Sequence, residues 1–253
     1  MFNSYERVDD LNRNGLRVIQ DPKRFCFGID AVLLTGIVRA GPTERLLDLG
    51  TGTGIIPILL TAKTKCKSFT GLEIERESVD MARRSVRLNK LEDIVAIDEG
   101  DIRLAAGIYK PSAFDVVTAN PPYIPVGGGL VNETSPKAIA RHELLCTLDE
   151  CIKSAAAVLK PSGRFYMVHR PQRLVDIMTL LREHGLEPKY LRLVYPHVDK
   201  PPNMVLLSAS KGGRSMLDVA PPLVVYGADG EYTDEVREIY GAESECAMTR
   251  GTV

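Results

Sequence analysis

The stretch Asp48-Leu-Gly-Thr-Gly-Thr-Gly54 decides the fold. It overlaps the end of Arg45-Leu-Leu-Asp-Leu49, a short apolar run typical of a buried strand in a parallel sheet. An apolar segment follows, which we expect to be helical from about Ile55. Pro57 then falls in the first helical turn, where a missing N–H is harmless. A strand, a glycine turn and a helix in this order indicate a ligand site at the carboxyl end of the strand.

The rest of the chain alternates short apolar runs with segments of helical spacing. Strands are expected over 16–20, 45–49, 67–73, 94–98, 114–119 and 164–169, with a closing hairpin near 190–195 and 204–210. Helices are expected over 31–38, from 55, over 75–90, from about 142 to 159, over 171–184 and near 233–240. This alternation predicts an open α/β sheet of seven strands, mostly parallel with one antiparallel strand, and helices on both faces.

Composition describes an ordinary globular protein. The formal net charge is −1 at pH 7, so only a local patch could attract an anionic polymer. No two cysteines have the spacing Cys-x-x-Cys, so we expect free thiols and no metal site. Free thiols are typical of a reducing compartment, and we expect the protein to be cytoplasmic. The cysteines are Cys26, Cys66, Cys146, Cys151 and Cys246. Charged residues interrupt the N-terminus and long apolar runs are missing, so we expect neither a signal peptide nor a membrane span.

The spacing of the glycines separates two classes of ligand. A dinucleotide site has the pattern G-x-G-x-x-G, whose third glycine lets the helix pack on the strand. Ile55 stands at that third position. The carboxylate of Asp48 would oppose a pyrophosphate and suits a cationic amine. Another nucleotide is the alternative ligand of such a turn. The predicted binding residues here are Asp48, Gly50, Thr51, Gly52 and Gly54.

Two further acidic residues follow strands at the same edge of the predicted sheet. Glu73 can accept two hydrogen bonds from a ribose diol, and Asp101 can accept one from the exocyclic amine of adenine. An amine, a ribose and an adenine together describe S-adenosylmethionine. Ile74 and Ile102 complete the predicted cofactor site, together with Asn120. The alternatives are a surface carboxylate for Glu73 and a loop cap for Asp101.

The stretch Asn120-Pro-Pro-Tyr123 follows the strand expected over 114–119. An amine on a planar group is a poor nucleophile because its lone pair is delocalised. The Asn120 side-chain carbonyl and the Pro121 backbone carbonyl can accept hydrogen bonds from such an amine. Pro122 stiffens the turn, and Tyr123 can stack on a planar acceptor. We predict that these four residues are catalytic rather than only a turn that closes the strand.

The glycine turn and the Asn-Pro-Pro-Tyr motif resemble those of the class I S-adenosylmethionine-dependent methyltransferases, over roughly residues 45–210. The resemblance implies a Rossmann-like methyltransferase domain over 46–211. Residues 1–45 would form an N-terminal element that covers the substrate and cofactor. Residues 212–253 would form an acidic C-terminal extension, either loosely attached or containing the short helix near 233–240.

Three other stretches resemble one family within that class, the bacterial tRNA adenine-N6 methyltransferases that modify the adenine 3′ of the anticodon in a valine tRNA. They are Phe25-Cys-Phe-Gly-Ile-Asp30, Ala138-Ile-Ala-Arg-His-Glu143 and Lys200-Pro-Pro-Asn203. The resemblance implies a tRNA substrate, no metal, and a monomer or homodimer. The residues assigned to substrate binding are Phe27, Asp30, Arg141, His142, Lys200 and Asn203. Core packing is the alternative for Phe27, an N-cap of helix 31–38 for Asp30, and a cap or surface pair for Arg141 and His142.

Residues 160–214 carry ten Lys or Arg against four acidic residues, which predicts a basic face for RNA or, alternatively, an ordinary solvated surface. Three other functions stay open. Glutamine methyltransferases of release factors share the glycine turn and Asn-Pro-Pro-Tyr, although they usually carry a separate N-terminal helical domain. A non-catalytic nucleotide-binding module would have no use for carbonyls that face an amine. A nicotinamide oxidoreductase is disfavoured by the glycine spacing.

Overall fold

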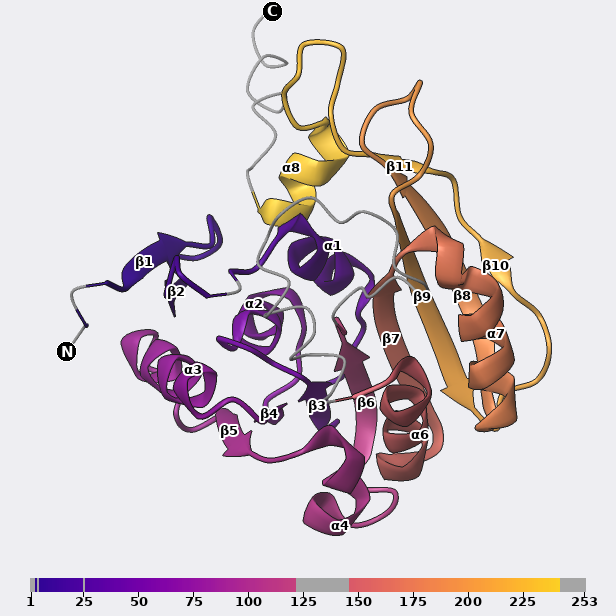
Figure 1. The fold of residues 1–253 in the computed structure, drawn as a ribbon, viewed down its shortest axis with the longest axis horizontal. Coiled ribbons are helices and arrows are strands. Elements are labelled where there is room, and N and C mark those ends of the chain that lie inside the picture. The colour runs from indigo at the N-terminus through magenta and orange to yellow at the C-terminus, as the bar shows by residue number, and fades with distance from the viewer. Residues whose placement is uncertain (1–2, 4, 25, 122–145, 242–253) are drawn as a thin grey trace, which may run out of the picture.

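A nine-stranded sheet forms the centre of the chain in the computed structural model, which describes residues 3, 5–24, 26–121 and 146–241 (Figure 1). Its long strands are β3 (Leu46–Leu49), β4 (Phe69–Glu73), β5 (Val95–Glu99), β6 (Phe114–Ala119), β7 (Leu159–His169), β8 (Leu186–Tyr195) and β9 (Met204–Lys211). Two-residue strands β10 (Asp218–Val219) and β11 (Leu223–Val224) pair with β8.

The strand order is β5-β4-β3-β6-β7-β9-β8, with β10 and β11 beyond β8. Strand β9 is antiparallel to β7 and β8, and all other pairs in this sheet are parallel. The predicted open, mostly parallel sheet with one antiparallel strand is therefore confirmed, and the short strands β10 and β11 extend its seven predicted strands to nine. The order in which strands are added to the sheet reverses at β3, which pairs with β4 on one side and with β6 on the other. Ligands bind at such a switch point in open α/β sheets.

Helices cover both faces of the sheet, as predicted (Figure 1). On one face lie α1 (Ile29–Ile37), α2 (Ile55–Lys63), α3 (Arg76–Leu88) and α8 (Asp234–Tyr240). On the other lie α4 (Ala105–Tyr109), α6 (Leu148–Val158) and α7 (Leu174–Glu183), with the short 3-10 turns η1 (Ile102–Leu104) and η2 (Pro171–Arg173) before α4 and α7. None of the helices in the described ranges is long and apolar enough to cross a membrane.

Two strands begin earlier than the sequence pattern predicts. Strand β7 starts at Leu159, and the pairing of β6 with β7 shifts register between Phe114 and Val116. The helix predicted to end at 159 ends at Val158, and Pro161-Ser-Gly163 lies within β7. Strand β8 likewise starts at Leu186. Polar and turn-forming residues in a strand hide its beginning from a pattern of apolar residues.

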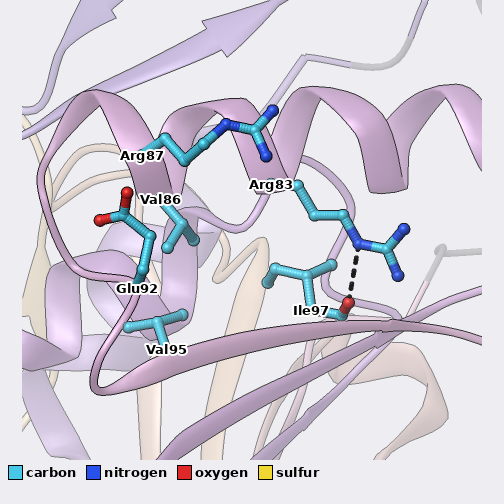
Figure 2. Close-up of a pocket in the computed structure, with 6 residues that line it drawn as sticks. All are labelled: Arg83, Val86, Arg87, Glu92, Val95 and Ile97. Atoms are coloured by element: carbon cyan, nitrogen blue, oxygen red, sulfur yellow. Dashed lines mark hydrogen bonds between the residues drawn. The ribbon is translucent and has the colours of Figure 1, made fainter.

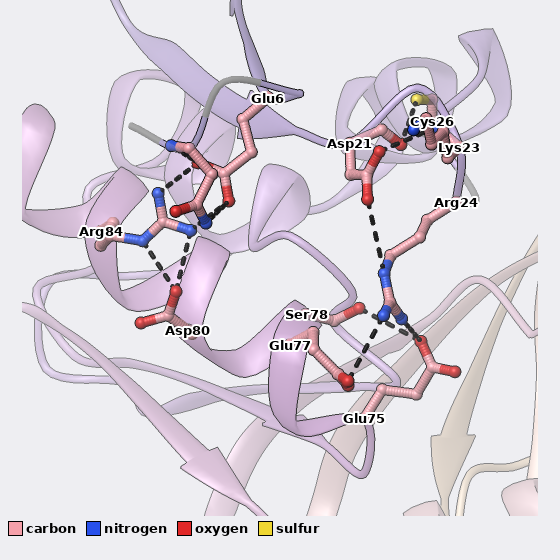
Figure 3. A network of polar contacts seen from close by, with 11 residues as sticks. Glu6, Asp21, Lys23, Arg24, Cys26, Glu75, Glu77, Ser78, Asp80 and Arg84 are labelled. Carbon is pink, nitrogen blue, oxygen red and sulfur yellow. Dashed lines mark hydrogen bonds and ion pairs between the residues drawn. The ribbon is translucent and has the colours of Figure 1, made fainter. Parts of the chain in front are cut away.

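An antiparallel hairpin of β1 (Arg7–Asp10) and β2 (Arg17–Gln20) lies outside the main sheet and packs on α3. The Ile19 N–H donates to Ser85 Oγ at 2.9 Å, and the Arg17 N–H donates to Asn89 Oδ1 at 2.9 Å. Arg84 pairs with Glu6 at 2.6 Å and with Asp80 at 2.8 Å (Figure 3). The N-terminal element is thus fastened to the outer surface of α3.

The described part of the C-terminal extension is packed into the fold. Leu223, Val225 and Val236 are buried in the same core as α1 and α2. Helix α8 packs against α1, and its N-cap is Thr233, so the predicted short helix is confirmed. The segment 212–241 is therefore anchored to the core through these three side chains and α8, while residues 212–222 lie on the surface.

Lys63 at the end of α2 is a half-buried cation that joins α2 to α1. Its Nζ donates to Thr35 Oγ1 at 2.7 Å, and that hydroxyl donates to the Val32 carbonyl at 2.6 Å. Desolvation and, to a lesser degree, the Arg13 charge together lower the pKa of the Lys63 amine to about 7. The folded state therefore binds this proton less tightly than the unfolded chain, whose lysine pKa is 10.5.

We expect Lys63→Met to change how stability depends on pH. Between pH 7 and about 10 the unfolded chain holds a proton that folded Lys63 has lost, so wild-type stability rises with pH at up to about 1.4 kcal/mol per unit. The variant lacks this contribution. Urea denaturation at pH 6, 7.5 and 9 should show the variant's stability advantage largest at pH 6 and smallest at pH 9. A stability difference independent of pH would contradict a depressed pKa at Lys63.

Candidate active site

The glycine turn lies between β3 and α2 and adopts backbone angles that favour glycine. The φ angles of Gly50, Gly52 and Gly54 are +70°, +55° and +85°. Residues with a Cβ rarely adopt these values, which explains the glycine at every second position. The Gly50 and Thr51 N–H groups both bond to the Leu72 carbonyl of β4, at 2.9 and 3.0 Å. The turn is thereby held against the end of the neighbouring strand.

Asp48 is fully buried beneath this turn with one oxygen left without a partner. Its Oδ1 accepts a hydrogen bond from Thr118 Oγ1 at 2.7 Å, and among the described residues nothing bonds to its Oδ2. Desolvation raises the pKa of this carboxyl to about 7. The Thr51 hydroxyl is also buried and lies close enough to Asp48 to lower the pKa of that carboxyl, but it makes no hydrogen bond of ordinary geometry within the described ranges. Buried polar atoms of this kind call for a ligand, and a cationic amine would satisfy the carboxylate best.

Glu73 ends β4 and is a buried carboxylate, so its alternative as a surface residue is wrong. Its Oε2 accepts from the Gly52 N–H at 2.9 Å, and its Oε1 accepts from the N–H groups of Ile74 and Glu75 at 2.8 and 2.9 Å. A carboxylate has about four acceptor positions. These bonds fix the orientation of Glu73 beside the glycine turn and leave capacity for one hydroxyl donor, one fewer than the two ribose bonds predicted for it.

Asp101 is the N-cap of the turn η1, as its alternative as a loop cap describes. Its Oδ1 accepts from the Arg103 N–H at 2.8 Å, and its Oδ2 pairs with the Arg103 guanidinium at 2.5 Å. This pairing with Arg103 lowers the pKa of the Asp101 carboxyl. Ile102 lies closer to the glycine turn, since its Cδ1 is 3.5 Å from the position that a Cβ on Gly50 would occupy. Ile102 is thus placed to contact a ligand held by the turn.

Asn120 follows β6 on the face of the sheet that carries Asp48. Thr118 pairs with Asp48 in the register of β6 and β3, and side chains two residues apart on a strand share a face. The Asn120 side chain donates from Nδ2 to Asp30 Oδ2 of α1 at 3.1 Å. Pro121 is half-buried beside it. The structure therefore brings Asp48, Thr118, Asn120 and Asp30 to one edge.

Asp30 is not the N-cap of α1, contrary to that alternative prediction. Gly28 occupies the N-cap position, and Asp30 lies in the first turn of the helix with 8% of its surface exposed. Phe27 packs against the core, and its N–H donates to Gln20 Oε1 at 2.9 Å. Phe27 thus makes the core contacts that its alternative describes, while part of its surface stays exposed.

The remaining predicted substrate residues divide into two groups. Lys200 and Asn203 lie in the turn between β8 and β9. Lys200 is exposed, and Asn203 has a buried side-chain oxygen without a partner among the described residues. The Asn203 carbonyl accepts from Arg170 at 3.0 Å. Outside the described residues lie Pro122, Tyr123, Arg141 and His142.

Sequence reasoning missed Thr118 and Arg24. Thr118 connects the two motifs, and its place two residues before Asn120 was a usable signal. Arg24 pairs with Asp21 at 3.6 Å and with Glu77 at 3.3 Å (Figure 3). Because α3 follows directly after Glu73, this cluster fastens the loop before α1 close to the ribose side of the predicted cofactor site.

A shallow pocket on the outer surface of α3 and β5 contains none of the predicted site residues (Figure 2). Its lining consists of Arg83, Val86, Arg87, Glu92, Val95 and Ile97. The Arg83 Nε donates to the Ile97 carbonyl at 3.0 Å, so that arginine is held against the strand. Within the described ranges no three His, Cys, Asp or Glu side chains are arranged to hold a metal ion.

Comparison with known proteins identifies the family. Residues 41–189, more than half of the chain, match the family described as a methyltransferase domain. A relative in Porphyromonas gingivalis named tRNA1(Val) (adenine(37)-N6)-methyltransferase is 27% identical over 217 residues, which cover 82% of this chain and 84% of that protein. A relative of the same name in Aeromonas salmonicida is 24% identical over 208 residues, covering 82% and 85%.

Solved structures share the fold. A predicted O-methyltransferase from Agrobacterium tumefaciens superposes with a TM-score of 0.68 at 23% identity, covering 84% of this chain and 96% of that one. A geranyl diphosphate C-methyltransferase from Streptomyces coelicolor, solved with S-adenosyl-L-homocysteine, gives 0.54 at 13% identity, covering 72% and 76%. The family match over the sheet and glycine turn agrees with the resemblance inferred from the two motifs. The chain belongs to the methyltransferase-domain family.

Proposed function

We propose that this protein transfers a methyl group from S-adenosylmethionine to the exocyclic N6 of an adenine in tRNA. The observation that carries the proposal is the arrangement of Asp48, Thr118 and Asn120 on one face of β3 and β6. Asp48, a buried carboxylate with an unpaired oxygen, suits a cationic amine. Asn120, an amide, suits a planar amine that accepts a methyl group, and it lies next to Asp48. A site for the methyl donor and a site for the methyl acceptor must be adjacent in the same manner, because the methyl group passes directly between them.

The buried groups around the glycine turn fit this cofactor. Asp48 Oδ2 would accept from its amino group, Glu73 from its ribose, and Ile74 and Ile102 would flank its adenine. When bound, S-adenosylmethionine supplies a methyl group on a sulfonium sulfur, which keeps the bonding electron pair once the acceptor takes the methyl. The Arg24 contacts beside Glu73 support a role of residues 1–45 in covering this site.

The acceptor side would work mainly by alignment. The Asn120 and Pro121 carbonyls accept the N–H groups of a planar amine, which directs its lone pair and raises its electron density during attack. Asn120 carries no charge and is no general base, so the proton that the product loses goes to solvent. Alignment of two reactants can supply up to roughly 7–11 kcal/mol of the barrier reduction. Reaching N6 requires the adenine to leave its stack.

The names of the relatives support tRNA, and in particular the adenine 3′ of the anticodon in a valine tRNA. The basic residues of 160–214 support tRNA binding over a smaller surface than predicted. Lys160 and Arg164 lie at the opposite end of β7 from the site and pair with Asp115 and Glu44, so the ten basic residues do not form one face. Arg170, directly after β7, is exposed at the site edge, as is Lys200. These cations are suitably placed for phosphates.

Incubation of the protein with labelled S-adenosylmethionine tests the substrate directly. We expect label in tRNA, and mass spectrometry of its nucleosides should detect N6-methyladenosine. Total tRNA and a purified release factor are offered in parallel reactions. Label confined to the release factor would contradict the proposal and favour a glutamine methyltransferase, and label in neither would favour a nucleotide-binding module.

Asn120→Ala should separate binding from chemistry. The variant keeps Asp48, Glu73 and the glycine turn, so the dissociation constant for S-adenosylmethionine should change less than about twofold. Loss of an oriented acceptor typically costs about 10²–10³ in kcat, and we expect a loss of that size. Calorimetry and single-turnover methyl transfer measure the two quantities. Wild-type activity in the variant would remove Asn120 from the catalytic machinery.

Cofactor affinity should depend on pH through Asp48. The carboxyl, with its pKa raised to about 7, is protonated below that pH and must ionise to bind a cationic amine. Affinity should thus fall up to tenfold per unit below pH 7 and level off above it. Calorimetric titrations between pH 5.5 and 8 measure this slope. Asp48→Asn should bind weakly with no such slope, and an unchanged slope in the variant would assign it to another group.

A further inference from the structure

The Asp30 carboxylate accepts a hydrogen bond within α1 and another that joins the N-terminal element to the catalytic motif. Its Oδ1 accepts from the Ala31 N–H at 2.9 Å, within the first turn of α1. Its Oδ2 accepts from Asn120 Nδ2 at 3.1 Å, across 90 residues of sequence. The carboxylate is also buried, so water competes little for either bond.

An asparagine amide has two chemically different branches, and only one of them suits an amine. Nδ2 carries two donors, and Oδ1 is the acceptor. A half-turn of the terminal torsion exchanges them with little change of shape, which is why the branches are assigned from their hydrogen bonds. A carboxylate can only accept, so Asp30 selects the rotamer in which Nδ2 faces α1. Oδ1 then occupies the other branch of the same plane.

We propose that Asp30 is a positioning residue, which fixes the Asn120 amide so that its carbonyl oxygen, and not its amino group, is presented to the methyl acceptor. The inference rests on the proposed function only in requiring a planar amine as the acceptor. With the amide reversed, Asn120 would direct N–H groups at an amine that needs an acceptor. The reversed rotamer would be unproductive in every encounter.

Gly28 provides the space in which this carboxylate sits. A Cβ on Gly28 would lie 2.8 Å from Asp30 Oδ1, closer than real Cβ contacts. The φ angle of Gly28 is −104°, which any residue adopts, so the glycine is needed here for space and not for its backbone angle. Gly28→Ala therefore displaces the Asp30 carboxylate while both Asp30 and Asn120 keep their chemistry.

The experiment compares Asp30→Ala and Gly28→Ala with wild-type protein, using the acceptor that wild type methylates. Both variants should lower kcat about 10- to 100-fold, the size of effect that slight misplacement of a reacting group causes. The dissociation constant for S-adenosylmethionine should change less than twofold. Thr35→Val is the matched control, since it also removes a buried polar group from α1, but one whose hydrogen bonds go to Lys63 and Val32. Its kcat should equal that of wild type.

A double-mutant cycle distinguishes positioning from direct contact with the acceptor. If Asp30 acts through Asn120, then adding Asp30→Ala to Asn120→Ala should lower single-turnover rates less than twofold. If Asp30 touches the acceptor itself, the two losses should multiply, and the proposal is overturned. It is also overturned if Asp30→Ala keeps the wild-type kcat, or if Thr35→Val loses as much as Asp30→Ala. An inactive wild-type protein would instead refute the proposed function.

Discussion

The hydrogen bond between Thr118 Oγ1 and Asp48 Oδ1 is the interaction on which the site depends. It connects two parallel strands at their shared carboxyl edge and uses one oxygen of a carboxylate that has no access to water. Taking a carboxylate out of water is costly, and one hydroxyl does not repay that cost. The buried Asp48 carboxylate on β3 therefore stays only partly compensated by hydrogen bonds. A cationic ligand supplies the missing compensation.

The two terminal segments hold the acceptor side of that edge. Helix α1 contributes Asp30, and the loop before α1 is tied to α3 by Arg24 (Figure 3). From the other end of the chain, α8 packs against α1. Within the described residues the rings of Tyr226, Tyr232 and Tyr240 stack with centroids 5.3 and 5.4 Å apart, which fastens α8 to the segment after β11. Both extensions thus stabilise the helix that orients Asn120.

Periodicity was sufficient to predict the central sheet, because each long strand has its own apolar run. It did not predict the short helix α4 in the crossover from β5 to β6. It could not reveal β1, whose residues Arg7–Asp10 are polar and mostly exposed, or the two-residue strands β10 and β11. The positions of Asp48, Glu73 and Asn120 at strand ends were predictable for the same reason. The burial of Glu73 and its three backbone donors were not, since they depend on how the turn folds over β4.

Contacts between distant segments explain the other differences. A local reading of Asp30 suggests a helix cap, because nothing in its neighbourhood announces a partner 90 residues away. The charge count over 160–214 predicted one basic face, yet Lys160 and Arg170 lie at opposite ends of β7, a strand of eleven residues. A count of charged residues along the sequence therefore predicts a charged surface only when the directions of the strands are known.

A crystal structure with S-adenosyl-L-homocysteine tests the central claim most directly, since that molecule keeps the amino group, ribose and adenine of the proposed cofactor. The account predicts its amino nitrogen within about 2.7–3.2 Å of Asp48 Oδ2, its ribose at Glu73, and the Asn120 amide still bonded to Asp30 through Nδ2. A ligand whose amino group lies elsewhere, with Asp48 Oδ2 still unpartnered, would contradict it.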